Sequence, residues 1–308
     1  MHSAPCRSLD ILGEDLKEIN DLRTLPYLVR NIPFAMMNPT PIRLTFLMLK
    51  YLKQLATTLF SAILMLSSGF FPGTANAATD TTVVLVHGAW TDGSSWSSIV
   101  SILQKRGLKV VAVQLPRTSL PADAAVVSQA IDAQSGQVIL VGHSYGGAVI
   151  TQAGNSPKVA ALVYVSAFAP GDGQSINEMI SPFPKPAWAS GIIANSAGYL
   201  SLSTDTFLKD FAPDVRKSIA TVMAATQGPI FAHCLDDKVS VAAWKSKPSW
   251  WVYGDQDQMI PPQFQQAEAH ALNAKLSVIP GASHVALVSH PTAVANVIMQ
   301  AVDKTASQ

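Results

Sequence analysis

Residues 137–149 of the chain read QVILVGHSYGGAV. The apolar run 137–141 is typical of a strand buried on both faces, and the small residues that continue to about Gly154 predict a helix. Between them lies Gly142-His143-Ser144-Tyr145-Gly146, a G-x-S-x-G sequence. A G-x-S-x-G sequence between a strand and a helix predicts a strained turn that lifts the serine hydroxyl off the sheet. Ser144 is therefore the candidate nucleophile; the alternative is a glycine-rich turn with an incidental serine.

The sequence on both sides of this turn alternates between apolar runs and helical patterns. Fully apolar strands that alternate with helices predict a parallel sheet covered on both faces, here of about six strands with right-handed crossovers. The alternation breaks at residues 171–248, which are proline-rich at first and then show short helical stretches. We therefore expect an α/β core of residues 78–170 and 249–308, with residues 171–248 inserted as a helical lid. Strands are expected at 82–86, 108–113, 137–141, 159–165, 250–253 and 276–279.

The N-terminal part contains a targeting pattern that does not begin at the first residue. A short basic head starts at Met48, an apolar stretch follows over 55–71, and Ala75-Asn76-Ala77 is a small-residue cleavage signal. That order predicts a signal peptide over 48–77, with cleavage after Ala77 and a periplasmic or secreted product. A membrane anchor is the alternative, but serines and threonines interrupt the apolar stretch, so no stable membrane insertion is expected. Residues 1–47 are interpreted as a non-native or disordered extension.

Composition narrows the class of protein. Apolar residues make up 48% and charged residues 13% of the chain, which excludes intrinsic disorder. A net charge of +1 without a clustered basic face gives no basis for nucleic-acid binding. After cleavage Cys234 is the only cysteine, so no internal disulfide can form. No Cys/His spacing predicts zinc, and neither a metal nor a cofactor is expected.

A serine hydroxyl needs a base to remove its proton. His284 follows the last predicted strand, within Gly281-Ala-Ser-His284. This is the end of the sheet where catalytic groups gather in open α/β folds, so His284 is the candidate base.

Three other histidines are given different roles. His87 directly follows a strand and is expected to brace a loop by hydrogen bonding. His143 is expected to point away from the chemistry if Ser144 points toward it. His233 lies in the insertion and could contact substrate.

The base in turn needs a carboxylate to hold its tautomer and orientation. Gly254-Asp255-Gln256-Asp257 follows the strand 250–253 and lies between the serine and the histidine in chain order. Ser…Asp…His is the order expected for this architecture. Asp257 is the candidate and Asp255 the alternative.

A tetrahedral intermediate requires backbone donors for its oxyanion. The N–H of Tyr145, the residue after the nucleophile, is one expected donor. The N–H of Ala89, in the loop after the first strand, is the other. Trp90 could form a wall of the acyl pocket, although a large aromatic residue is more often plain core.

Together these segments resemble the α/β-hydrolase superfamily over nearly all of residues 78–308. The segments VLVHGAW, VGHSYGGAV, ALVYVSAFAP, AWKSKPSWWVYGDQDQMIPP and GASHVALVSHP are similar to a branch of small bacterial esterases laid out like plant methylesterases and hydroxynitrile lyases. The resemblance implies a Ser144–His284–Asp257 triad, no cofactor, a lid over an apolar pocket and carboxylic-ester substrates. Hydrophobic esters, among them bulky aromatic ones of the pyrethroid type, are the expected substrates.

Three alternatives to an esterase remain at this point. Plant hydroxynitrile lyases that resemble this chain carry threonine and lysine where it has Gly88 and Val285, which counts against lyase chemistry. A cofactor-free perhydrolase would share the triad. A non-catalytic binding protein of the same fold is expected to have a broken triad, whereas the predicted triad of this chain is complete. The sequence does not reveal the oligomeric state.

Overall fold

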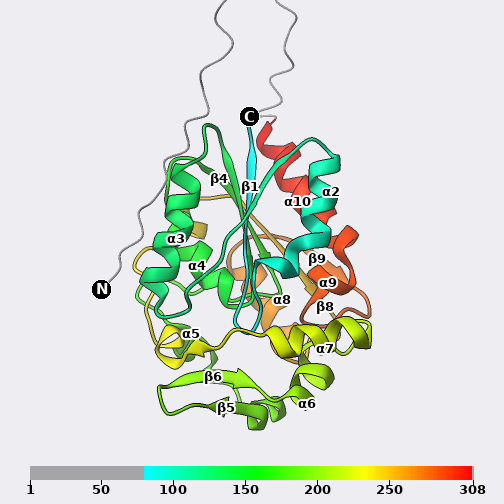
Figure 1. Cartoon of the computed structure of the whole chain (residues 1–308). Coiled ribbons are helices and arrows are strands. Elements are labelled where there is room, and N and C mark those ends of the chain that lie inside the picture. The colour runs from blue at the N-terminus through cyan, green and yellow to red at the C-terminus, as the bar shows by residue number, and fades with distance from the viewer. Residues whose placement is uncertain (1–79, 307–308) are drawn as a thin grey trace, which may run out of the picture. The chain divides into compact units, whose positions relative to one another are not determined.

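The computed structural model describes residues 80–306, and the expected signal peptide and N-terminal extension lie outside these residues. Six strands form one sheet in the order β2-β1-β3-β4-β8-β9, and every neighbouring pair is parallel (Figure 1). The strands are β1 (Thr82–Val86), β2 (Lys109–Ala112), β3 (Val138–His143), β4 (Val159–Val165), β8 (Ser249–Gly254) and β9 (Lys275–Ile279). The predicted parallel sheet of about six strands is confirmed.

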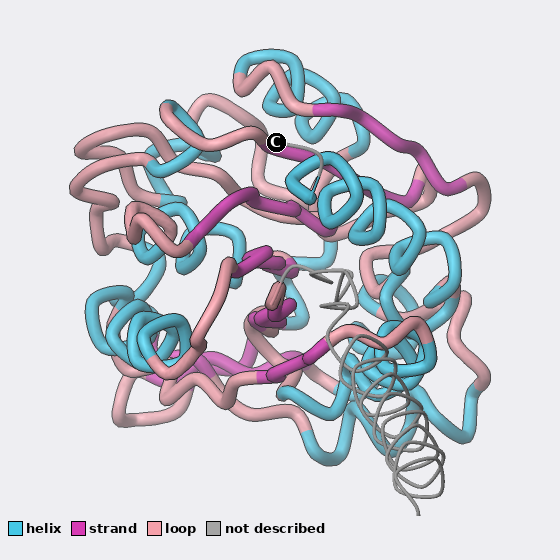
Figure 2. The backbone as a smooth tube through the Cα atoms, turned by 90° about the horizontal axis from the view of Figure 1, so that it is seen from above, coloured by secondary structure: helices cyan, strands magenta, loops and turns pink. Residues whose placement is uncertain are grey.

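Helices cover both faces of this sheet (Figure 2). Helices α2 and α10 contact each other on one face, while α3 and α4 contact each other on the opposite face. The helices of the core, with the short 3-10 turn before α2, are η1 (Gly93–Trp96), α2 (Ser97–Lys105), α3 (Leu120–Asp132), α4 (Tyr145–Ala153), α8 (Pro262–Ala271), α9 (Ala286–Ser289) and α10 (Pro291–Ala306). Helix α3 starts where the Ser119 side chain accepts a hydrogen bond from the N–H of Ala122, which satisfies a free donor of the first turn.

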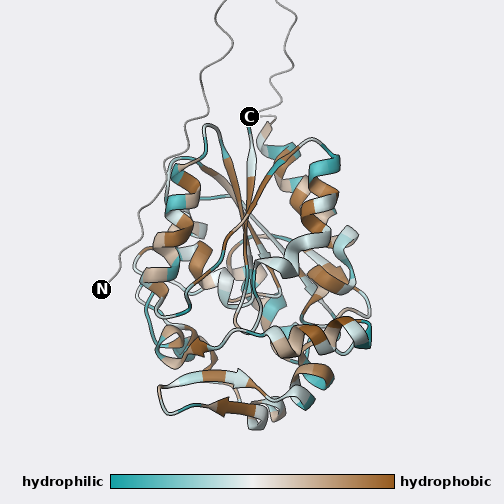
Figure 3. Cartoon of the chain, viewed as in Figure 1, coloured by the Kyte–Doolittle hydropathy of each residue, from teal (hydrophilic) through white to brown (hydrophobic). Residues whose placement is uncertain are grey.

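The core lies between the sheet and these two helical layers. Every residue of β1, β3 and β8 is buried, and the strands are mainly hydrophobic in Figure 3. Strands buried on both faces have no polar side, so their apolar runs are continuous rather than alternating.

The strand order places a change of direction beside the predicted nucleophile. Strand β1 connects through α2 to β2 on one side, whereas β3 connects through α4 to β4 on the other. Ligands of open α/β sheets bind outside the carboxyl ends of strands at such a switch point. The Ser144 turn follows β3, and the loop that contains Ala89 follows β1, so both lie there.

The insertion contains short helices, as expected, together with strands that were not predicted. It contains a three-stranded antiparallel sheet in the order β5-β6-β7 in addition to helices. Asn195 and Gly198 explain the hairpin: the Asn195 side chain accepts the N–H groups of Ala197 and Tyr199, and Gly198 adopts a φ of +81°. The elements of the insertion are α5 (Ile176–Ile180), η2 (Ala187–Gly191), β5 (Ile192–Ala194), β6 (Tyr199–Leu202), α6 (Thr204–Thr206), η3 (Phe207–Phe211, a π-helix), α7 (Lys217–Thr226), β7 (Ile230–Phe231), η4 (Ala232–Leu235) and η5 (Ala243–Lys245).

Among residues 80–306, no helix has both the length and the apolar character required to span a bilayer.

Candidate active site

Ser144 occupies a strained turn between β3 and α4. Its φ of 54° and ψ of −123° lie in a region that side-chain-bearing residues rarely adopt. The neighbouring glycines allow the tight turn: a Cβ added to Gly142 would lie 2.4 Å from the Gly146 carbonyl oxygen, and one added to Gly146 would lie 2.6 Å from that of Val86. The predicted elbow geometry is therefore present, and Ser144 is 7% exposed.

Asp257 and His284 form a buried hydrogen-bonded pair. Nδ1 of His284 lies 2.9 Å from Oδ2 of Asp257, and the two side chains are almost completely inaccessible to solvent. The carboxylate also accepts the N–H groups of Met259 (2.9 Å) and Ile260 (3.0 Å) and the side-chain amide of Gln265 (2.8 Å). Four donors thus hold one buried carboxylate, and its orientation relative to the imidazole is fixed.

Asp255, the alternative carboxylate, lies elsewhere. It is exposed, and its Oδ1 accepts the N–H of Gly281 at 2.7 Å. It therefore joins the loop after β8 to the loop after β9 without contacting the imidazole. The structure pairs His284 with Asp257.

His143 does not point away from the candidate site as the sequence suggested. Its ring centroid lies 4.8 Å from that of His284, and its Nε2 donates to the His284 carbonyl oxygen at 3.1 Å. Complete burial lowers the pKa of His143 well below its usual value, so the ring is neutral. The expectation fails because the loop after β9 folds back over the end of β3, an arrangement that no local pattern encodes.

His87 braces a loop, as predicted. Its Nε2 accepts the N–H of Leu115 at 3.0 Å, so its Nδ1 carries the proton and donates to the Gly88 carbonyl oxygen at 2.8 Å. Burial lowers the pKa of His87 to about 4. The loop between β1 and η1 is therefore held by a neutral imidazole.

The Ser144 hydroxyl and the imidazole are not directly hydrogen-bonded within residues 80–306. The His284 ring is nevertheless held next to the turn, because it packs on His143, the residue before Ser144, and its centroid lies 5.2 Å from that of the Phe211 ring. Hydrogen bonds between catalytic groups are often long in unliganded enzymes and tighten when substrate binds.

Two backbone amides next to Ser144 have no hydrogen-bond acceptor among the described residues. Tyr145 is the first residue of α4, so its N–H has no partner within the helix. The Ala89 N–H is likewise without an acceptor. The loop that carries Ala89 lies close to the serine, since a Cβ added to Gly88 would be 2.8 Å from the Ser144 Cβ.

Trp90 contacts the insertion from the same loop. Its backbone has a φ of 59°, its indole N–H donates to the Leu200 carbonyl oxygen at 3.0 Å, and its ring packs edge-on against Trp188 and Phe211. Phe211 in turn contacts the His284 ring. An aromatic cluster therefore connects the loop after β1, the insertion and the imidazole.

His233 lies where the insertion meets helix α3 of the core. Its side chain is 63% exposed, and its Nε2 pairs with Asp237 at 3.2 Å. Asp237 also accepts the N–H of Leu120 at the start of α3. The structure therefore places His233 where the insertion joins the core, away from the contacts made by Ser144, Asp257 and His284.

Two site residues were missed by sequence reasoning. Gln265 lies on α8 and donates to Asp257, as described above. Asp214, in the insertion, accepts the backbone N–H of Ser283 at 3.0 Å and also its hydroxyl. Ser283 precedes His284, so Asp214 ties the histidine loop to the insertion. A single glutamine or aspartate in such segments carries no recognisable motif.

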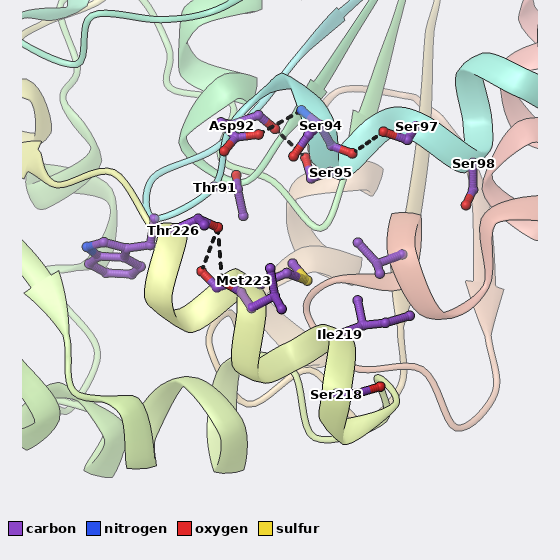
Figure 4. Close-up of a pocket in the computed structure, with 13 residues that line it drawn as sticks. Thr91, Asp92, Ser94, Ser95, Ser97, Ser98, Ser218, Ile219, Met223 and Thr226 are labelled. Carbon is purple, nitrogen blue, oxygen red and sulfur yellow. Dashed lines mark hydrogen bonds between the residues drawn. The ribbon is translucent and has the colours of Figure 1, made fainter.

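A cleft of about 420 Å³ lies between helix α7 and the segment 91–98, next to Trp90 (Figure 4). Helix α7 contributes apolar side chains on one side, and the segment 91–98 contributes hydroxyl groups on the other. The lining residues are Trp90, Thr91, Asp92, Ser94, Ser95, Ser97, Ser98, Ser218, Ile219, Val222, Met223, Thr226 and Val288. Trp90 is shared with the aromatic cluster, whereas Ser144, Asp257 and His284 do not line the cleft.

The described part of the chain, residues 80–306, contains no cluster of three or more His, Cys, Asp or Glu side chains placed to hold a metal ion.

Comparison with known proteins places this architecture among enzymes. The chain is 28% identical over 205 residues to a probable hydrolase, R7, of Phoma sp., which covers 59% of this chain and 80% of that protein. It is 35% identical over 111 residues to a carbendazim hydrolyzing esterase of Nocardioides sp., which covers 32% of this chain but only 46% of the esterase. A pyrethroid hydrolase from Sphingobium faniae JZ-2 has a similar fold, with a TM-score of 0.62 and 20% identity over 74% of this chain and 99% of that one.

The model of the alpha/beta hydrolase family matches residues 83–297. This region holds the elbow serine, the carboxylate and the imidazole, and it is well over half of the chain. The chain therefore belongs to the alpha/beta hydrolase family.

Proposed function

We propose that the protein is a serine carboxylesterase that hydrolyses hydrophobic carboxylic esters through an acyl-enzyme intermediate. The observation that carries this proposal is the buried His284–Asp257 pair at 2.9 Å, packed beside the strained Ser144 turn. Membership of the family supports hydrolase chemistry, and relatives named as esterases support ester substrates.

In the acylation step Nε2 of His284 takes the proton of the Ser144 hydroxyl as the oxygen attacks the ester carbonyl. Asp257 accepts the Nδ1–H, fixes the tautomer and stabilises the imidazolium. The imidazolium then protonates the departing alkoxide, so the alcohol leaves and the acyl group remains on Ser144.

Deacylation repeats these proton transfers with water as the nucleophile. His284 removes a proton from water, the resulting hydroxide attacks the acyl-enzyme, and the Ser144 oxygen leaves as it regains the proton. The amides of Ala89 and Tyr145 stabilise the oxyanion in both steps. Loss of one such donor costs about 3 kcal/mol of transition-state stabilisation.

The aromatic cluster beside His284 supports an apolar substrate. Trp90, Trp188 and Phe211 form a connected aromatic cluster that reaches the His284 ring. Burial of apolar surface contributes about 25 cal/mol per Å², so a bulky hydrophobic acyl or alcohol group would bind more tightly than a small one. The pyrethroid hydrolase with a similar fold makes bulky aromatic esters a natural first choice for assay. His233 stays a proposed substrate contact, because its side chain is 63% exposed.

The absence of the threonine and lysine of plant hydroxynitrile lyases, replaced here by Gly88 and Val285, counts against lyase chemistry. A Cβ at position 88 would lie 2.8 Å from the Ser144 Cβ, so a threonine requires the loop or the serine to shift. A perhydrolase would use the same triad, and peroxide-dependent turnover in acetate separates it from an esterase.

The decisive experiment measures hydrolysis of p-nitrophenyl butyrate by the parent and by Ser144→Ala, together with labelling by a fluorophosphonate probe. We expect turnover and labelling in the parent and neither in the variant. Equal rates in both proteins, or a parent that does not react with the probe, would contradict the proposal and support a non-catalytic binding protein of the same fold.

We also propose that residues 48–77 are a signal peptide and that the esterase is periplasmic or secreted. N-terminal sequencing of the protein recovered outside the cytoplasm should begin at Ala78. An intact Met1 on that protein would refute this proposal.

A further inference from the structure

Two charged residues, Asp123 and Arg117, each contact one of the two segments that carry the expected oxyanion donors. Asp123 lies on α3 and is completely buried. Its Oδ2 accepts the hydroxyl of Tyr145 at 2.6 Å, and its Oδ1 accepts the backbone N–H of Arg117 at 2.7 Å. The side chain of the residue whose amide is one expected donor is therefore anchored on a buried carboxylate.

Arg117 reaches the second donor segment. Its Nη1 donates to the carbonyl oxygen of Thr91, two residues after Ala89. Arg117 has a φ of 56°, which side chains rarely adopt, so the surrounding contacts hold it in a strained conformation.

Arg117 also contacts the insertion. Its guanidinium lies directly against the Gly228 backbone, where an added Cβ would be 1.9 Å from Nη2. Its carbonyl oxygen accepts the N–H of Phe231 at 2.9 Å. One arginine thus fixes the loop after β1 and a segment of the insertion at the same time.

The protonation states suit this network. Burial raises the pKa of Tyr145, which keeps its hydroxyl protonated and able to donate. Burial also raises the pKa of Asp123, while the bond from Tyr145 and the nearby Arg117 favour the charged form. Burying a carboxylate such as Asp123 is costly unless its oxygens are hydrogen-bonded, and both of them are.

We propose that Arg117 and Asp123 are positioning residues that set the relative placement of the two oxyanion-hole amides, Asp123 through Tyr145 and Arg117 through Thr91. The inference rests on the esterase function proposed above. Oxyanion donors act only at about 2.7–3.1 Å from the developing charge, so a small relative shift of the two segments weakens binding of the tetrahedral state more than binding of the ester.

Tyr145→Phe and Arg117→Met test the two arms, with Arg117→Lys as the conservative variant and Arg106→Met as the matched control. Arg106 is exposed and bonds Asn296. For each variant, kcat and KM are measured on p-nitrophenyl butyrate. The inhibition constant of an alkyl trifluoromethyl ketone, which forms a tetrahedral adduct on serine, is compared with that of the matching methyl ketone.

We expect Tyr145→Phe and Arg117→Met to lower kcat on the order of ten- to a hundred-fold with KM changed less than about two-fold. The trifluoromethyl ketone should lose affinity by a similar factor while the methyl ketone does not, and Arg117→Lys should recover part of the loss. Arg106→Met should match the parent.

Parental kcat in Tyr145→Phe and Arg117→Met would overturn the inference, as would equal loss of affinity for both ketones. If Arg117→Met does not fold, Tyr145→Phe and Arg117→Lys test the inference, through the ratio of the inhibition constants of the trifluoromethyl and methyl ketones. Ser144→Ala separates the two proposals. If it abolishes turnover while the network variants are unaffected, only the positioning role fails; if it remains active, the esterase mechanism fails.

Discussion

Asp257 and His284 meet with Oδ2 and Nδ1 2.9 Å apart, although the two residues come from different loops, after β8 and β9. The carboxylate requires a proton on Nδ1, which leaves Nε2 of the imidazole free to act as a base. This relationship distinguishes the two acids of the Gly254–Asp257 turn, and it leads to the first prediction.

Asp257→Asn should lower kcat about 10⁴-fold, because an amide in this position favours the wrong imidazole tautomer. Asp255→Asn is the matched control: the same substitution two residues away in an exposed carboxylate should leave kcat within about two-fold of the parent. The measurement is steady-state hydrolysis of p-nitrophenyl butyrate. A larger effect of Asp255→Asn would show that the other carboxylate orients the base.

Gln265→Leu should destabilise the protein by about 1–3 kcal/mol, because it leaves buried polar groups without partners. The Gln265 amide donates to Asp257 and to the Ile260 carbonyl oxygen, and it is fully buried. Urea denaturation gives the change in unfolding free energy. Gln266→Leu, an exposed position on the same helix, should change it by less than about 0.5 kcal/mol; similar losses in both variants would contradict the expectation.

Gly88→Ala should reduce kcat by about 10²-fold, since displacement of a reacting group by about 1 Å can have an effect of this size. The new Cβ would lie 2.8 Å from the Ser144 Cβ, so either the serine or the loop must move. Gly171→Ala is the control, because its Cβ would meet only the Gln174 side chain at 3.5 Å. An unchanged kcat in Gly88→Ala would contradict the prediction and show that the loop moves without displacing Ser144.

The sheet could be predicted from the sequence because its strands are buried on both faces and therefore appear as continuous apolar runs. The elbow was equally predictable from its G-x-S-x-G pattern, and Gly142 is required within the turn itself, where an added Cβ would lie 2.4 Å from the Gly146 carbonyl oxygen. The position of Asp257 followed from chain order and strand ends. Each of these features is marked by a local pattern of residues along the chain.

The insertion and the supporting contacts could not be predicted in the same way. Asp214 and Ser283 are 69 residues apart, and Trp90 and Leu200 are 110 residues apart. Their pairing depends on how the insertion docks, which periodicity does not encode. The antiparallel strands of the insertion were missed because they are only two to four residues long, too short for a period of two to be recognised.

His87 should make stability depend on pH. An unfolded histidine has a pKa near 6.5, whereas burial lowers that of His87 to about 4, so between these values only the unfolded state gains the proton. The unfolding free energy should therefore decrease as pH falls from about 6.5 to 4, by up to about 3 kcal/mol from this residue. His87→Gln keeps an acceptor for the Leu115 N–H but cannot titrate. Urea denaturation at pH 7 and at pH 4.5 gives the decrease in unfolding free energy between the two pH values. This decrease should be about 2–3 kcal/mol smaller in the variant than in the parent. An equal decrease in both proteins would rule out His87 as the source.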